Sequence, residues 1–292
     1  MLPEELKKDI ESLLVESSGS AILISQLQSV GGGCINEAYA IQTNIGKYFI
    51  KYNSATAHPG MFAKEAAGLK ILADTNSIPV PEIIGNRETN EYAYLLLRYI
   101  ENGTPDRNFW TGFGTKLADL HRNTSENFGL DHDNYIGSLE QSNKMHPDFF
   151  NFFISERIDP QLKMARNKGA FNQSDMRYFD SLYKLLPEII PVEKPALIHG
   201  DLWSGNFMVS RDGSPCLVDP AVYYGHREAD IAMTQLFGGF KPEFYHAYNQ
   251  AWPMEKDWQK RMEIFNLYPL LVHVNLFGGS YARQVLQIIR QF

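Results

Sequence analysis

Hydrophobic positions in the first hundred residues change between the period of a helix and that of a strand. Leu6, Ile10, Leu13 and Leu14 recur at the spacing of one helix face. Residues 22–52 instead form short apolar runs separated by glycine-containing turns, and residues 92–99 are as apolar as a central strand. This pattern predicts a sheet accompanied by helices. The predicted helices are 3–17 and 61–73, and the predicted strands are 22–30, 37–43, 47–52 and 92–99.

The remainder of the chain reads as mainly helical. A polar segment at 101–105 suggests a boundary between an N-terminal lobe, residues 1–101, and a C-terminal lobe, residues 102–292. Asp106 is a plausible cap for a helix ending near Arg122. The predicted fold is α+β with two lobes and a cleft between them: a small antiparallel sheet with a helix, then a larger helical lobe. Further helices are expected at 148–166, at 174–186 and from 226 onward, with loops and short strands at 197–219.

Composition narrows the class of protein. The 292 residues are 44% hydrophobic, enough for a sizeable core, and the net charge of −7 disfavours nucleic acid as a partner. Two cysteines do not make a disulfide framework or a zinc site. The N-terminus does not resemble a signal peptide, and no segment approaches the ~18–20 apolar residues that cross a membrane. A cytoplasmic location without membrane contact is therefore expected.

The strongest chemical signal lies between His199 and Asp219. Asp201 and Asn206 stand five positions apart on one loop, and Asp219 follows a short apolar run. A carboxylate that accepts a hydroxyl proton, with further oxygen ligands for magnesium, is what phosphoryl transfer requires. An ordinary polar turn is the alternative, but three such side chains inside an apolar frame favour a kinase. His199 is expected to order the loop through hydrogen bonds.

A second signal precedes the first along the chain. Gly31, Gly32 and Gly33 join two predicted strands and would let backbone N–H groups approach phosphates. Lys51 lies in an apolar strand and Glu65 in the next helix, so an ion pair that holds ATP phosphates is plausible. Taken singly, these residues also fit a flexible hairpin, a strand-edge lysine and a solvated glutamate. Their order before Asp201 favours an ATP site.

Gly200 and the Asp219-Pro220-Ala221 sequence depart from the protein-kinase pattern and favour small-molecule kinases of the aminoglycoside and choline phosphotransferase type. Longer motifs resemble the fructosamine kinases, also called ketosamine-3-kinases. The resemblance covers the chain from about residue 20 to its end. It is carried by residues 31–35, 199–206, 218–233, 236–240 and 275–279.

This resemblance implies a protein-kinase-like fold and phosphorylation, by ATP with Mg²⁺, of the sugar 3-hydroxyl of ketoamines. The ketoamine would be carried by a free amine or a protein lysine, and the unstable product would then leave the amine, which repairs glycation. The implied site residues are Asp201 as catalytic base, Asn206 and Asp219 as metal ligands, Lys51 and Glu65 as the ATP-anchoring pair, and Arg98, Tyr99 and Ile100 in the adenine-contacting hinge.

Four residues near the predicted base have two interpretations each. Trp203 could stack on a sugar or pack in the core. His226 and Arg227 could shape the acceptor pocket or belong to a buried ion-pair network, which we favour. Asp230 is expected to cap the catalytic loop through hydrogen bonds rather than to take part in catalysis.

The cysteines bear on assembly. The resemblance implies that Cys34, in the glycine loop, forms redox-sensitive disulfide-linked dimers, so the protein is expected to be a monomer or such a homodimer. The loop after Cys34 is shorter than in animal members of the family, which bears on any such dimer. Cys216 is expected to be buried and inert.

Two other functions remain open from the sequence: a kinase of the same fold with an aminoglycoside, choline or homoserine-like acceptor, and a catalytically inactive kinase-like binding protein. The motifs at 203 and 226–230 favour the ketoamine enzyme over the first. The presence of Lys51, Asp201, Asn206 and Asp219 disfavours the second. The sequence does not distinguish fructosamine, ribulosamine and erythrulosamine, because one carbon is worth only about 1–3 kcal/mol in a pocket.

Overall fold

The computed structural model describes residues 2–31 and 36–292. The chain divides into two compact units. The first unit comprises residues up to Asp106 together with Met208–Asp219, and the second comprises Arg107–Phe207 and Pro220–Phe292. The expected boundary after residue 101 would place Met208–Asp219 in the C-terminal lobe, whereas the structure assigns this segment to the first unit. Backbone hydrogen bonds account for this: Gly103 N–H donates to the Val209 carbonyl (2.8 Å), and Leu217 N–H donates to the Pro79 carbonyl (2.9 Å).

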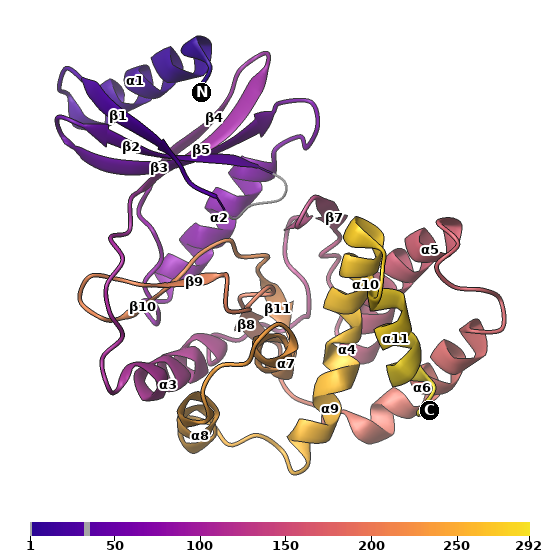
Figure 1. Ribbon diagram of the computed structural model, residues 1–292. Helices are drawn as coiled ribbons and strands as arrows, with labels where there is room; N and C mark the ends of the chain where they lie inside the picture. Colours follow the sequence, from indigo (N-terminus) through magenta and orange to yellow (C-terminus); the bar gives the residue numbers. More distant parts are fainter. Residues whose placement is uncertain (1, 32–35) are drawn as a thin grey trace. The chain divides into compact units, whose positions relative to one another are not determined.

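The first unit is built on a five-stranded antiparallel sheet in the order β1-β2-β3-β5-β4 (Figure 1). β5, predicted as a central strand, lies between β3 and β4. The sequence analysis missed β4, whose Gly85-Asn86-Arg87 run has no strand-like alternation. The strands are β1 (Ile24–Ser29), β2 (Glu37–Thr43), β3 (Gly46–Ser54), β4 (Ile83–Glu88) and β5 (Tyr92–Arg98), and the helices are α1 (Glu4–Ser18) and α2 (Met61–Asp74).

Each face of this sheet is covered by one helix (Figure 1). Leu6, Ile10 and Leu14 of α1 are fully buried against one face, in a cluster that includes Ile50. Leu69 of α2 and its neighbours pack on the other face. Because successive strand residues point to opposite faces, the two helices sort the sheet into two apolar layers.

The second unit is mainly helical. α3 approaches α8 so closely at Gly114 that a Cβ there would lie 2.2 Å from the Phe244 carbonyl oxygen. The elements are α3 (Phe109–His121), α4 (Phe149–Phe152), a π-helical turn (Phe153–Ile158), α5 (Asp159–Asn167), α6 (Met176–Ile189), α7 (Glu228–Leu236), α8 (Pro242–Ala251), α9 (Trp258–Phe265), α10 (Leu267–Phe277) and α11 (Tyr281–Ile289). Short strands form two pairs in this unit: β6 (Asn134–Ile136) with β7 (Leu139–Gln141), and β8 (Ala196–Ile198) with β11 (Tyr223–Gly225). A third pair, β9 (Phe207–Val209) with β10 (Pro215–Leu217), lies largely in the segment Met208–Asp219 of the first unit.

These elements confirm the predicted α+β class, with an antiparallel sheet in the first unit and a mainly helical second unit. One local prediction is wrong. α3 begins at Phe109 after Asn108, so Asp106 lies too far upstream to be its cap. Across residues 2–31 and 36–292, none of the helices has the length and apolar content needed to cross a membrane.

Candidate active site

A buried ammonium group with two carboxylate partners forms the polar centre of the first unit. Lys51 Nζ lies 2.6 Å from Glu65 Oε1 and 2.8 Å from Asp219 Oδ1. Burial lowers the pKa of Lys51, but the two carboxylates outweigh this and raise it, so the ammonium stays charged. Burial raises the pKa of Glu65, and Lys51 opposes that shift. The pairing of Lys51 with Glu65 that the sequence suggested is present, and its role toward a nucleotide stays a prediction.

Strand alternation explains how Lys51 meets Glu65. Ile50 points into the core under α1, whereas Phe49 packs with Leu95 in the layer under α2. Lys51 is two positions after Phe49, so its side chain points to the same face of the sheet, toward α2. Glu65 lies within the first turns of that helix. A lysine buried in an apolar layer requires an anionic partner, and α2 supplies it.

Asp219 has an unusual backbone conformation. Its φ of 54° lies in the left-handed region, which aspartate tolerates better than most residues do. Such strain costs on the order of 1–3 kcal/mol and is concentrated at functional sites. The side chain is half exposed and its Oδ1 faces Lys51, so this carboxylate combines a fixed position with access to solvent.

The predicted catalytic loop lies in the second unit, where Asn206 holds Asp201. Asn206 Nδ2 donates to the Asp201 carbonyl (2.8 Å) and to Asp201 Oδ2 (2.9 Å), which orients the carboxylate. Gly200, with φ of +83°, precedes the aspartate. A Cβ at this position would lie 2.1 Å from the Ala221 carbonyl oxygen. The loop therefore requires glycine where protein kinases have arginine.

Asp230 anchors the start of this loop from α7. Its carboxylate accepts hydrogen bonds from His199 N–H (2.7 Å), Gly200 N–H (2.9 Å) and His121 Nε2 (3.1 Å). Burial raises the pKa of Asp230, but these hydrogen bonds outweigh it and hold the pKa below its usual value. His199 is fully buried, and its Nδ1 accepts from Asp201 N–H (3.3 Å). Both residues have the structural roles that the sequence suggested.

The anchor extends to residues that sequence reasoning missed. His121 lies on α3 and is fully buried. Its Nε2 lies 3.1 Å from Asp230 Oδ2, and its Nδ1 lies 2.8 Å from the Tyr248 hydroxyl on α8. A lone histidine at the end of an apolar helix carries no signal of this role.

Trp203 belongs to an aromatic cluster in the second unit. Its ring packs edge-on against Phe237 at 6.2 Å, and the ring of His273 lies 4.6 Å from Phe237 and 5.0 Å from Tyr281. We call Trp203, Phe237, His273 and Tyr281 the aromatic cluster. Sequence reasoning missed the last three. The Leu-Phe-Gly-Gly sequence at 236–239 and 276–279 was a usable signal, since both phenylalanines contact His273.

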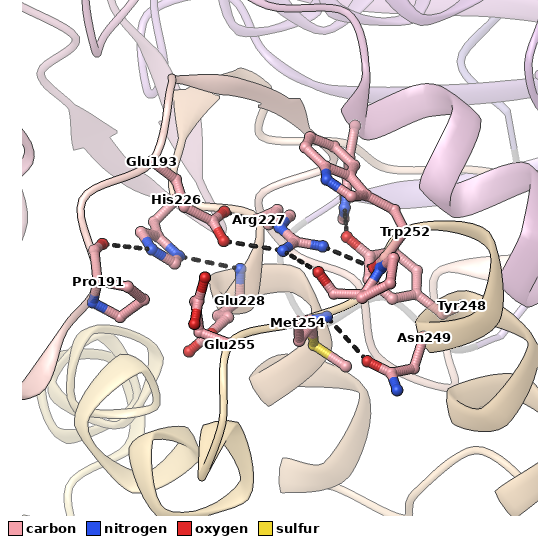
Figure 2. Close-up of polar contacts among 12 residues, drawn as sticks. Pro191, Glu193, His226, Arg227, Glu228, Tyr248, Asn249, Trp252, Met254 and Glu255 are labelled. Atoms are coloured by element: carbon pink, nitrogen blue, oxygen red, sulfur yellow. Dashed lines mark hydrogen bonds and ion pairs between the residues drawn. The ribbon is translucent and has the colours of Figure 1, made fainter.

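His226 and Arg227 lie in a buried ion-pair network rather than on an acceptor pocket (Figure 2). Arg227 donates to Glu193 through Nε (2.7 Å) and Nη2 (2.8 Å) and also to the Trp252 and Pro253 carbonyls. His226 Nε2 contacts the Pro191 carbonyl (3.2 Å), and burial lowers its pKa. The suggestion that these residues bind substrate is therefore corrected, because their polar groups are used inside the protein.

The remaining predicted nucleotide-binding residues are those of the hinge and the glycine loop. Arg98 pairs with Glu82 (3.0 Å), and the Lys47 ammonium lies 3.7 Å from the ring centre of Tyr99. The adenine-contacting role of Arg98, Tyr99 and Ile100 stays a prediction. Gly31 is exposed, whereas Gly32, Gly33 and Cys34 lie outside the described residues.

Cys216 is buried in β10, as the sequence suggested. Burial raises the pKa of its thiol to about 12. The thiol is therefore neutral at physiological pH, in agreement with an inert residue.

Comparison with protein families decides the identity of this arrangement. Residues 6–292 match the family model described as fructosamine kinase. The chain belongs to the fructosamine kinase family. A protein of Enterococcus faecium named "Probable ketoamine kinase" is 42% identical over 265 residues, which are 90% of this chain and 94% of the relative. The chloroplastic protein-ribulosamine 3-kinase of Arabidopsis thaliana is 37% identical over 94% of this chain and 85% of its own.

Solved structures agree with this membership. A crystal structure of a candidate fructosamine-3-kinase from Haemophilus somnus has a TM-score of 0.87, 31% identity and coverage of 97% of this family member and 96% of its own chain. An aminoglycoside phosphotransferase in ternary complex with AMP-PNP and hygromycin B has a TM-score of 0.62 at 16% identity, with coverage of 97% and 98%. The second likeness concerns the fold alone.

Proposed function

We propose that this chain transfers the γ-phosphoryl group of ATP to the sugar 3-hydroxyl of a ketosamine, as the first step of deglycation. The observation that carries the proposal is the buried Lys51 ammonium, held 2.6 Å from Glu65 and 2.8 Å from Asp219. A kinase needs a lysine fixed in this way to hold ATP phosphates. Relatives named for ketoamine and ribulosamine substrates support the choice of acceptor.

Each residue of the set has a role in this proposal. Lys51 binds the α- and β-phosphates, Glu65 fixes the ammonium, and the glycine loop with Gly31 covers the phosphates. Asp201, oriented by Asn206, accepts the proton of the attacking hydroxyl. Arg98, Tyr99 and Ile100 lie at the adenine.

Asp219 and Asn206 fit magnesium chemically. A carboxylate and an amide oxygen are the hard donors that Mg²⁺ prefers, and the side chain of Asp219 is half exposed. Asp219 and Asn206 would hold the ion. When bound, Mg²⁺ neutralises charge that develops on the transferred phosphoryl group.

The aromatic cluster binds the ketosamine that accepts the phosphoryl group. A ketosamine presents a sugar face and a cationic secondary amine, and aromatic rings bind both by stacking and cation–π contact. Burial lowers the pKa of His273, so its ring is neutral at physiological pH and does not repel that amine.

Trp203→Ala should therefore raise KM for the ketosamine about tenfold, since loss of such a contact costs about 0.5–2 kcal/mol. KM for ATP should change little. Steady-state kinetics with each substrate varied in turn measures both constants. An equal loss for the two substrates would assign Trp203 to core packing.

The proposed activity is tested by an ATP-consumption screen of the purified protein. Ketosamines built on fructose, ribulose and erythrulose should be phosphorylated, whereas choline, a homoserine-like alcohol and aminoglycosides should not. Phosphorus NMR of the product locates the phosphate on the 3-oxygen. Turnover of choline or an aminoglycoside in preference to every ketosamine would overturn the proposal.

A further inference from the structure

A groove of about 770 Å³ is lined by residues of the second unit. Three stretches line it, at residues 124–128, 147–150 and 192–195. Its volume lies within the range of ligand pockets in proteins, which is about 300–1,000 Å³. Nothing in the phosphoryl-transfer proposal uses it.

Backbone hydrogen bonds hold the three stretches together. Ser125 N–H donates to the Pro195 carbonyl (3.3 Å), beside a bridge between Thr124 and Ala196. Phe128 N–H donates to the His146 carbonyl (2.9 Å), and His146 N–H donates back (3.0 Å). The groove is therefore a preformed part of the fold.

The groove combines apolar surface with acidic groups. Phe149 and Phe150 line it, and Val192 exposes 87% of its surface, more than any other large hydrophobic residue in the described ranges. Glu126, Asp148 and Glu193 face a single lysine, Lys194, among the lining residues. We call this site the acidic groove.

Two carboxylates of the acidic groove, those of Asp148 and Glu193, have pKa values below their usual range. Burial raises the pKa of Asp148, but hydrogen bonds from Asn151 outweigh it and lower the pKa. Arg227 does the same for Glu193 and balances its charge. With Glu193 balanced by Arg227, the carboxylates of Asp148 and the exposed Glu126 exceed the single Lys194 ammonium by one charge, which favours cationic ligands over nucleotides and other anions.

The wall at 192–195 is fixed to the helix that anchors the catalytic loop. Arg227 donates two hydrogen bonds to the Glu193 carboxylate, and its guanidinium lies 4.3 Å from the ring centre of Trp252 (Figure 2). Arg227 immediately precedes α7, and Asp230 on α7 accepts from His199 and Gly200. A ligand in the acidic groove thus binds next to a rigid support of the reacting loop.

We propose that the acidic groove binds an extended segment of a glycated protein that presents an apolar side chain and a lysine or arginine. The inference rests on the proposed function, because ketosamines on proteins are carried by lysine-bearing segments. The apolar lining accepts the hydrophobic side chain, and Glu126 with Asp148 accepts the cation. The groove would then select protein-bound over free ketosamines.

The test compares two substrates in three variants. Val192→Lys replaces the exposed apolar side chain of the rim by a positive charge, and Glu126→Lys reverses the charge of an exposed wall residue. Glu188→Lys is the matched control, an exposed glutamate of the second unit that does not line the groove. KM for a glycated basic protein should rise about tenfold in the first two variants, which corresponds to about 1.4 kcal/mol. For a free ketosamine, kcat/KM should stay within about twofold, as for ordinary surface changes.

A binding measurement separates this inference from the proposed activity. A short fluorescein-labelled peptide of leucine, lysine and glycine, without sugar, should bind the wild type and the Glu188→Lys variant but not Val192→Lys, as followed by fluorescence anisotropy. Equal binding to all variants, or displacement by spermidine as readily as by unlabelled peptide, would overturn the peptide assignment. A protein that binds the peptide but phosphorylates no ketosamine would refute the proposed function and leave the peptide site standing.

Discussion

Replacing Asp201 with asparagine should lower kcat about 10²–10⁴-fold, the contribution typical of a general base. The amide retains an oxygen that can accept the hydrogen bond from Asn206 Nδ2, now 2.9 Å from the carboxylate. It cannot accept a proton from the attacking hydroxyl. Turnover of a ketosamine measured by coupled ADP release reports the loss.

ATP affinity should change little in the same variant, because the proposed phosphate-binding residues Lys51 and Glu65 lie in the first unit. Isothermal titration with a non-hydrolysable ATP analogue checks this. Asp131→Asn is the matched control, with the same chemical change at an exposed side chain of the second unit. An Asp201→Asn enzyme as active as this control would remove the assignment of the base.

Removing Glu228 should destabilise the second unit by about 3–5 kcal/mol, the cost typical of leaving a buried charge unpaired. Glu228 is fully buried, and Arg261 donates to it through Nε (2.8 Å) and Nη2 (2.5 Å). Glu228→Leu would leave the buried guanidinium without the carboxylate that it contacts directly. Hydrogen bonds to the Lys256 and Glu255 carbonyls would satisfy only part of it.

The double variant Glu228→Leu/Arg261→Met should recover most of this loss, because both charges are then replaced by apolar groups. Urea unfolding followed by tryptophan fluorescence measures the cycle. All four tryptophans, residues 110, 203, 252 and 258, belong to the second unit, so the signal reports that unit. Additive effects of the two single variants would contradict the coupling.

Contacts between residues of one loop, or of elements that follow each other in the chain, were predictable. Lys51 lies in an apolar strand and Glu65 in the next helix, and this order suggested the ion pair that the structure contains. The glycine at position 200, Asp201 and Asn206 form one short loop, so their relation is local. These predictions depend on periodicities that the chain carries in itself.

Residues whose partners come from distant elements were not predictable. His121 and Tyr248 contact each other across 127 positions of sequence, and nothing in either segment indicates the other. The choice between a substrate-facing and a buried His226-Arg227 pair also required the structure, since Glu193 and the Trp252 carbonyl arrive from separate loops. Trp203 joins His273 through Phe237 in the same way.

The sequence by itself determined the fold class and the order of most main elements, and it suggested the set of residues proposed for phosphoryl transfer, because these follow from local periodicity and from motifs of fixed spacing. Only the tertiary structure decided which charges are buried, what anchors the catalytic loop and where an acidic groove forms. Those features depend on side chains that meet after distant segments pack, and a linear pattern does not encode which pairs meet.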